Sequence, residues 1–162
     1  MKNSYEVQYK KAIQAGINRD YQTSIVLFED LAAKGWSEQE PEVFLYLARS
    51  YHALGLFAQA VQWARVYISY KNEDGAGWFF LGRAYFSEGD FSHAVYALKK
   101  SLEFNPDSIA AQTFLGFSLL RCKKISTARA VFEKALEIAP DDDKLNQGYR
   151  NALFIEAVRT WR

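Results

Sequence analysis

The side chains that most often carry out chemistry in enzymes are few in this chain. It has two histidines, His52 and His93, and one cysteine, Cys122. A zinc site needs three or four ligands, and the sequence around neither histidine supplies such a cluster. Cys122 has basic neighbours that would favour a reactive thiolate, although a single cysteine near a helix end is more often a small apolar residue. We predict no catalytic residue, no metal site and no cofactor.

Two short motifs are similar to ligand-binding sequences but fit a structural role better. Gly75 and Gly77 form a Gly-x-Gly before a predicted helix, yet no predicted strand leads into them, as one does in nucleotide-binding loops. We interpret them as a turn between helices. The acidic run at 141–143 follows Pro140, where carboxylates cap the next helix and favour the positive end of its dipole. We interpret this run as a helix start, and the chain as not an enzyme.

The helices that must position any functional residue follow an internal repeat of 34 residues. One apolar place recurs at Leu47, Leu81 and Leu115. Pro106 and Pro140 are separated by the same interval and are predicted to end second helices. Small residues recur in the same register at Ala48, Gly82 and Gly116 and again at Ala60, Ala94 and Ala128. Agreement of this kind across three copies predicts a repeat architecture.

The spacing W-x2-L-G-x2-Y, followed by alanine, a bulky residue and proline, resembles the tetratricopeptide repeat family. The flanking copies depart from this pattern, because Asn72 replaces proline in 41–74 and Gln112 replaces tryptophan in 109–142. The first copy, about 5–38, is degenerate, and two extra residues follow it before Pro41. Residues 75–108 match most fully, with Trp78, Leu81, Gly82, Tyr85, Ala94, Leu98 and Pro106.

The resemblance implies an all-α fold, a right-handed superhelical α-solenoid of antiparallel helix pairs. About four repeats, at 5–38, 41–74, 75–108 and 109–142, and a C-terminal capping helix at about 143–161 would form a single domain over 1–162. The small residues of a repeat should meet where its two helices cross, so that a larger residue would push the helices apart. The expected pairs are Ala48 with Ala60, Gly82 with Ala94, and Gly116 with Ala128.

Each first helix is predicted to end at a residue in the left-handed conformation. Gly55 and Gly89 stand at this place, and glycine adopts that conformation without steric cost. Lys123 occupies the same place in the last repeat. We therefore expect this last turn to be strained or closed in a different way.

In this family the first helices line a concave face, so their side chains that are not used in packing should form a binding groove. Aromatic and arginine residues, which are enriched at interface hot spots, align there in rows at the repeat interval. Phe80 and Phe114 belong either to this groove or to the packing between repeats. The predicted groove residues are Tyr9, Leu45, Tyr46, Arg49, His52, Phe79, Arg83, Phe86, Thr113, Phe117 and Arg121.

The family's best-known site is a clamp of Lys, Asn and Arg that holds the C-terminal carboxylate of chaperones. This chain departs from it. The places of the clamp are filled by other residues, so a receptor for chaperone tails is not expected. These places hold Tyr9, Ile13, Tyr46, Ala76 and Phe80.

Composition and charge exclude several other classes of function. With 20 basic and 19 acidic residues the net charge is +1, which gives no overall field to attract nucleic acid or anionic lipid. No apolar run of about 18 residues predicts a membrane-spanning helix, and the N-terminus lacks the apolar segment of a signal peptide. We expect a cytoplasmic protein with no nucleic-acid partner and no membrane insertion.

Aromatic residues make up 16% of the chain, which is more than a small core needs, so some should lie on a working surface. We expect a chaperone-like scaffold or adaptor that binds an apolar or amphipathic protein segment. Acidic residues on that segment would pair with Arg49, Arg83 and Arg121. The alternative is a structural scaffold that forms homo-oligomers through its solenoid ends, with contacts at Tyr149, Trp161 and the poorly matched first helix.

Overall fold

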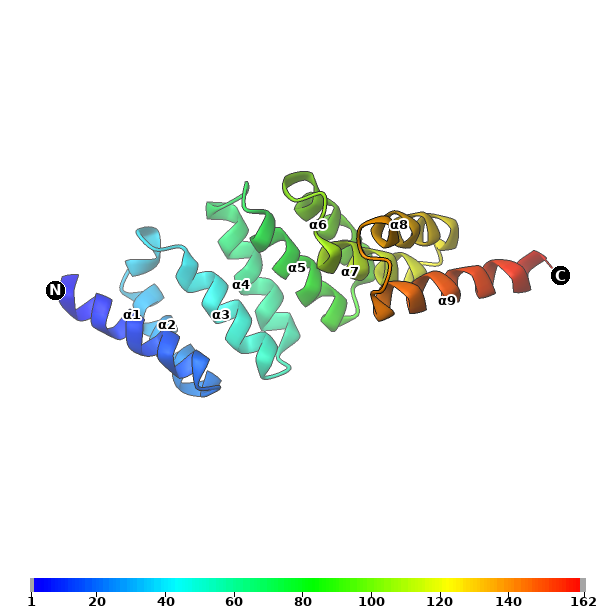
Figure 1. Ribbon diagram of the computed structural model, residues 1–162. Helices are drawn as coiled ribbons and strands as arrows, with labels where there is room; N and C mark the ends of the chain where they lie inside the picture. Colours follow the sequence, from blue (N-terminus) through cyan, green and yellow to red (C-terminus); the bar gives the residue numbers. More distant parts are fainter. Residues whose placement is uncertain (1, 161–162) are drawn as a thin grey trace. The chain divides into compact units, whose positions relative to one another are not determined.

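The computed structural model describes residues 2–160, and this part of the chain consists of helices joined by short connections (Figure 1). Contacts divide the chain into two compact units, unit 1 (residues 1–73) and unit 2 (residues 74–162). Unit 1 contains α1 (Lys2–Ile17), α2 (Tyr21–Ala33), the short 3-10 helix η1 (Trp36–Glu38), α3 (Glu42–Ala53) and α4 (Phe57–Tyr70). Unit 2 contains α5 (Gly75–Glu88), α6 (Phe91–Phe104), α7 (Ile109–Arg121), α8 (Ile125–Ile138) and α9 (Asp143–Thr160).

The helices follow the predicted repeats. Each repeat provides one pair of helices, and within unit 2 every helix packs against the next along the chain. The boundary between the units falls between two repeats, at residues 73 and 74. The longer connection after the first repeat contains η1 at residues 36–38, whereas the later repeats reach the next helix through a shorter connection. The prediction of a single domain over 1–162 stays a prediction. Trp161, at the end of the expected capping helix, lies outside the described residues.

The turns between paired helices close in one common way. Gly55 and Gly89 have φ of +76° and +93°, as predicted. Lys123 has φ of +60°. The N–H of Lys124 donates to the carbonyl of Leu119 at 2.9 Å, and in the same way the N–H of Asp90 donates to the carbonyl of Tyr85 at 3.0 Å. The last turn is therefore closed like the others. It carries the steric cost of a side chain in the left-handed region, on the order of 1 kcal/mol.

The starts of α5, α7 and α9 are also equivalent, whereas α3 begins after Pro41 without a side-chain cap. Asp74, Ser108 and Asp142 stand at the repeat interval, and each side chain accepts a hydrogen bond from a backbone N–H in the first turn of α5, α7 or α9. The acidic run is thus the start of α9, as predicted. The side-chain amide of Gln112 donates to the carbonyl of Pro106, and that of Asn146 to the carbonyl of Pro140, both at 2.8 Å. Gln112 therefore replaces the expected tryptophan with a hydrogen bond that holds the inter-repeat turn.

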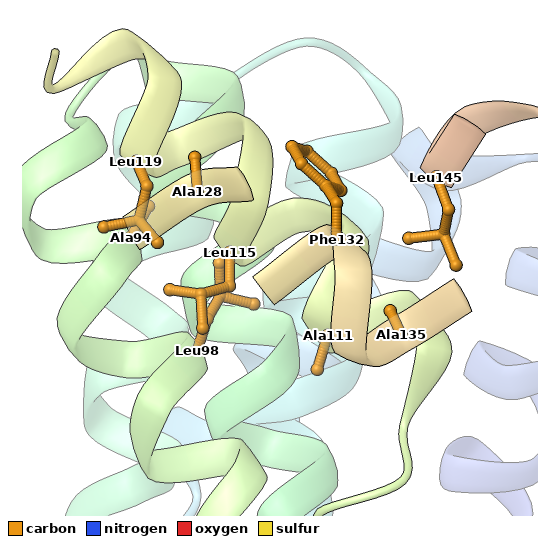
Figure 2. Packing of buried hydrophobic residues seen from close by; sticks show 9 residues of the cluster. All are labelled: Ala94, Leu98, Ala111, Leu115, Leu119, Ala128, Phe132, Ala135 and Leu145. Atoms are coloured by element: carbon orange, nitrogen blue, oxygen red, sulfur yellow. The ribbon is translucent and has the colours of Figure 1, made fainter. Parts of the chain in front are cut away.

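The core of unit 2 is a cluster of nine buried residues in α6, α7, α8 and α9 (Figure 2). Several of its members recur at the repeat interval. Phe132 is the repeat equivalent of Leu98, and Leu145 is the repeat equivalent of Ala111. Burial of these apolar side chains is the main force that holds the helices together. The cluster consists of Ala94, Leu98, Ala111, Leu115, Leu119, Ala128, Phe132, Ala135 and Leu145.

The close approaches of the helices involve glycines, and the nearest atoms opposite them belong to large residues. A Cβ atom added to Gly82 would lie 2.6 Å from Cγ of Leu98, and one added to Gly116 would lie 2.5 Å from Cε1 of Phe132. Ala94 and Ala128, which were expected there, are fully buried but lie one helical turn earlier. A glycine thus leaves room for a large side chain opposite, not only for another small one. The expected contacts of the small residues with one another stay predictions. The repeat pattern did not indicate Gly148 of α9, yet a Cβ added to it would also lie 2.5 Å from Cε1 of Phe132.

Candidate protein-binding surfaces

A chain of aromatic rings crosses α5, α6 and α7 in unit 2. The ring of Phe114 lies edge-on to those of Phe79 and Phe86, with centroids 5.9 and 5.3 Å apart. Phe86 in turn lies edge-on to Phe91 at 5.5 Å. The guanidinium of the exposed Arg121 lies over the ring of Phe91, 4.6 Å from its centroid. We call these five residues the unit 2 surface; its four phenylalanines are each half-buried.

Two other predicted groove residues of unit 2, Arg83 and Thr113, interact with residues of their own helices. The guanidinium of Arg83 lies 4.9 Å from the ring centroid of Phe80, which is only 5% exposed. Phe80 therefore belongs to the packing. Thr113 is buried as well, and its hydroxyl donates to the carbonyl of Ile109 at 2.8 Å. It has no exposed group to offer a ligand, so we do not retain it in the candidate surface.

Phe117 also contributes mainly to packing. It is half-buried, and its ring lies edge-on to that of Phe132 at 5.3 Å. Because Phe132 is the central ring of the buried cluster, Phe117 connects the core to the first-helix face of α7.

Unit 1 places three aromatic rings together. The ring of Tyr46 is stacked on that of Phe28, with centroids 5.3 Å apart and planes 2° apart. Tyr9 lies edge-on to both, at 5.9 Å from Phe28 and 6.1 Å from Tyr46. Phe28 is fully buried, whereas the two tyrosines are half-buried. Phe28 thus anchors two predicted groove residues, one on α1 and one on α3.

Two carboxylates contribute to the electrostatic surroundings of Tyr9. Its pKa is raised from 10.0 to about 12, first by burial and then by the charges of Tyr46, Glu40 and Glu42. Burial and negative neighbours both disfavour the ionised phenolate. Arginines were expected to set the charge of the groove, so the carboxylates of Glu40 and Glu42 are a new feature.

The remaining predicted residues of unit 1 are placed along α3. Leu45 is half-buried and Arg49 is exposed. The ring of His52 lies 5.2 Å from that of Phe57, at the start of α4. These three residues therefore place an apolar, a basic and an aromatic side chain on one helix.

The residue types capable of catalysis have structural roles where the chain is described. The backbone N–H of His93 donates to Asp90 Oδ1 at 3.1 Å, and its ring Nδ1 lies 2.6 Å from Asp90 Oδ2, so this pair caps α6. Cys122 Sγ lies 3.9 Å from the hydroxyl of Ser92. Gly75 and Gly77 lie in the first turn of α5, so the interpretation of these residues as a turn between helices was wrong. The carbonyl of Gly75 accepts a hydrogen bond from Ser101. Among residues 2–160 no group of three or more His, Cys, Asp or Glu side chains could hold a metal ion.

Sequence reasoning missed two contributors to these surfaces. Phe91 lies at the repeat interval from Phe57 and Ile125, at the start of a second helix, so the row that it shares with Phe57 could have been found. Glu40 lies in the two-residue insertion before Pro41 and has no counterpart in the other repeats. No periodic signal indicated its position near Tyr9.

Comparison with known protein families assigns the chain. One tetratricopeptide repeat model matches residues 9–75, and a second matches residues 85–152. The chain belongs to the tetratricopeptide repeat family. No curated protein matches it in sequence. This tetratricopeptide repeat protein has no helix within its described part that is long and apolar enough to cross a membrane.

Solved structures of similar fold support the architecture. A crystal structure of MamA protein has a TM-score of 0.88 at 18% identity, covering 99% of this chain and 86% of that one. MamA from Desulfovibrio magneticus RS-1, from residue 41 to its end, has a TM-score of 0.76 at 21% identity, covering 88% and 79%. The first tetratricopeptide repeat domain of Spaghetti (RPAP3), bound to an HSP90 peptide, has a TM-score of 0.70 at 18% identity, covering 74% and 94%. The predicted all-α solenoid fold class is confirmed.

Proposed function

We propose that this protein is a non-enzymatic scaffold or adaptor that binds a segment of a partner protein on the first-helix faces of its repeats. The observation that carries the proposal is the unit 2 surface, where four half-buried phenylalanines lie in mutual contact beside an exposed arginine. The predicted groove, the single domain over 1–162, the chaperone-like role and the cytoplasmic location belong to the same proposal.

The unit 2 surface is suited to binding because its rings are already fixed. Each phenylalanine contacts at least one other ring edge-on, a favourable geometry for aromatic pairs. Fixed side chains lose little conformational entropy when a partner covers them, so more of the binding energy is retained. An apolar side chain of a partner could cover Phe79 and Phe86 while an acidic one pairs with Arg121.

The bound peptide in the RPAP3 structure supports peptide binding by this fold. The mode of binding proposed here is different. Tyr9, Ile13 and Tyr46 fill places where the clamp of the family has polar side chains. We therefore propose recognition through aromatic rings and arginines along the segment, not through a C-terminal carboxylate.

The double substitution Phe86→Ala/Arg121→Glu should lower recovery of the partner from a lysate of the native cell at least tenfold. Phe86 contacts two rings of the unit 2 surface, and truncated hot-spot residues typically cost about 2 kcal/mol or more. Quantitative mass spectrometry of proteins that co-purify with wild type and variant measures the effect.

The matched control is Lys99→Glu/Phe104→Ala, which makes the same charge reversal and the same truncation at exposed positions of α6. It should recover the same proteins as wild type. Circular dichroism should show the same helix content in all three proteins. Recovery of every partner in equal amounts by the wild type and both variants would refute binding at this surface.

A second candidate function, self-assembly, is favoured by apolar side chains exposed on α9. Leu153, Phe154 and Val158 are 40%, 70% and 44% exposed, and large exposed apolar groups mark interaction sites when they are contiguous. Val7 and Val26 are exposed on α1 and α2. Light scattering over a range of concentrations distinguishes the two functions. A molar mass that remains that of a monomer at every concentration excludes self-assembly.

A further inference from the structure

Unit 1 carries a strip of aromatic rings next to acidic side chains. On α1, the ring centroid of Tyr5 lies 5.5 Å from that of Trp36. One helical turn further, the ring centroid of Tyr9 lies 6.1 Å from that of Tyr46. A hollow of about 280 Å³ opens beside Tyr5 and Trp36. Figure 1 shows α1 and α3, which carry three of these rings, within the same unit.

The aromatic strip is rigid. Phe28 is fully buried beneath it and stacks on Tyr46 with nearly parallel planes. The same ring lies edge-on to Tyr9. Trp36 is buried as well, at 6% exposure. A partner would therefore meet a preformed surface, not one that must order on binding.

The acidic side chains come from the segment that leads into α3. Glu38, Glu40 and Glu42 occupy alternate positions there. Glu42 lies 3.6 Å from Nζ of Lys71. In the described part of the chain, no basic side chain lies within 4.0 Å of a carboxylate oxygen of Glu38 or Glu40.

Among the described residues, the carboxylates of Glu38 and Glu40 therefore carry charges that no ion pair within 4.0 Å neutralises. Lys34, which lines the hollow beside Tyr5 and Trp36, forms an ion pair with Asp30 within α2. Glu40 and Glu42 also help to raise the pKa of Tyr9, after burial and Tyr46. Ring faces carry partial negative charge as well, so the rings and the carboxylates favour the same kind of ligand.

We propose that Tyr9, Tyr46, Glu40 and Glu42 form a docking surface for a protein segment that carries lysine or arginine between apolar residues. The apolar residues would cover the tyrosine rings. The basic head groups would lie over ring faces and pair with the carboxylates. The unit 2 surface differs because it contains Arg121, which favours an acidic residue on the partner. This inference rests on the proposed function and names the chemistry of the partner at unit 1.

Two helical peptides of equal length and identical apolar positions test the charge preference. One carries lysine at its charged positions and the other carries glutamate. Fluorescence anisotropy of the labelled peptides with the full chain, at low and at high salt, gives the affinities. The lysine peptide should bind wild type, and its binding should weaken as salt rises.

The variant Glu40→Gln/Glu42→Gln should weaken binding of the lysine peptide about tenfold and leave binding of the glutamate peptide unweakened. The control Glu133→Gln/Glu137→Gln removes the same number of charges from exposed positions of α8 and should bind like wild type. Glu40→Gln alone, which leaves the contact of Glu42 with Lys71 intact, should weaken binding in the same direction. This single variant keeps the test valid if the double variant is poorly folded.

The outcomes separate the two proposals. Equal affinity of the lysine peptide for the Glu40→Gln/Glu42→Gln variant and the α8 control would overturn this inference alone. So would binding of the glutamate peptide to wild type without binding of the lysine peptide. Failure of wild type to bind either peptide would overturn both this inference and the proposed function.

Discussion

Truncation of Phe132 to alanine should lower the free energy of unfolding by about 3–5 kcal/mol, the usual range for a buried phenylalanine. The ring is fully buried and is enclosed by Gly116 of α7 and Gly148 of α9. It therefore joins α8 to both neighbouring helices, and its loss leaves a cavity that helices packed at glycine cannot easily fill. Urea denaturation followed by circular dichroism measures the change.

The control is Phe154→Ala, the same substitution at a residue that is 70% exposed. It should change the free energy of unfolding by no more than about 0.5 kcal/mol. A double variant sharpens the test, because the added methyl of Gly116→Ala clashes with the Phe132 ring. Gly116→Ala should be markedly less destabilising in the Phe132→Ala background than in wild type. Equal effects in both backgrounds would contradict the assigned packing.

Replacement of Gly82 by leucine should lower the free energy of unfolding by about 1–3 kcal/mol, as overpacking of a helix crossing does. The added Cβ alone would lie 2.6 Å from Cγ of Leu98 and 3.2 Å from its backbone nitrogen. In a protein of this size each kcal/mol lowers the melting temperature by about 2–4 °C. Thermal unfolding followed by circular dichroism is the measurement.

Gly16→Ala is the control for crowding at a helical glycine. A Cβ there would meet Ser24 Oγ at 3.4 Å, an ordinary contact, and alanine favours helix over glycine by up to about 1 kcal/mol. This variant should melt at or above the wild-type temperature. An unchanged melting temperature in Gly82→Leu would contradict the repeat register.

Most of the fold follows from the periodic positions of the sequence. The interval between Leu47, Leu81 and Leu115 indicated which helices would be equivalent, and the left-handed turns at Gly55 and Gly89 were confirmed. The contact partners of the glycines could not be obtained in this way, because they depend on the rotation and spacing of two helices. Gly148 lies two residues before the repeat equivalent of Gly116, so α9 meets Phe132 in its own geometry.

The candidate surfaces were predicted less completely, for physical reasons that differ between residues. Thr113 could be buried within a helix because its hydroxyl bonds to the carbonyl four residues earlier, which a pattern of exposed places does not reveal. Glu40 lies in an insertion outside the repeat, so its charge had no assigned position. Phe79, Phe86 and Arg121 were predicted, and the structure brings them together through Phe114 and Phe91.

A crystal structure of the full chain with the protein segment that co-purifies with it tests the central claim most directly. The proposed function predicts that the segment covers Phe79 and Phe86 and contacts Arg121. Ordered density for the segment on the second-helix faces of α6 and α8, with the unit 2 surface uncovered, would contradict it.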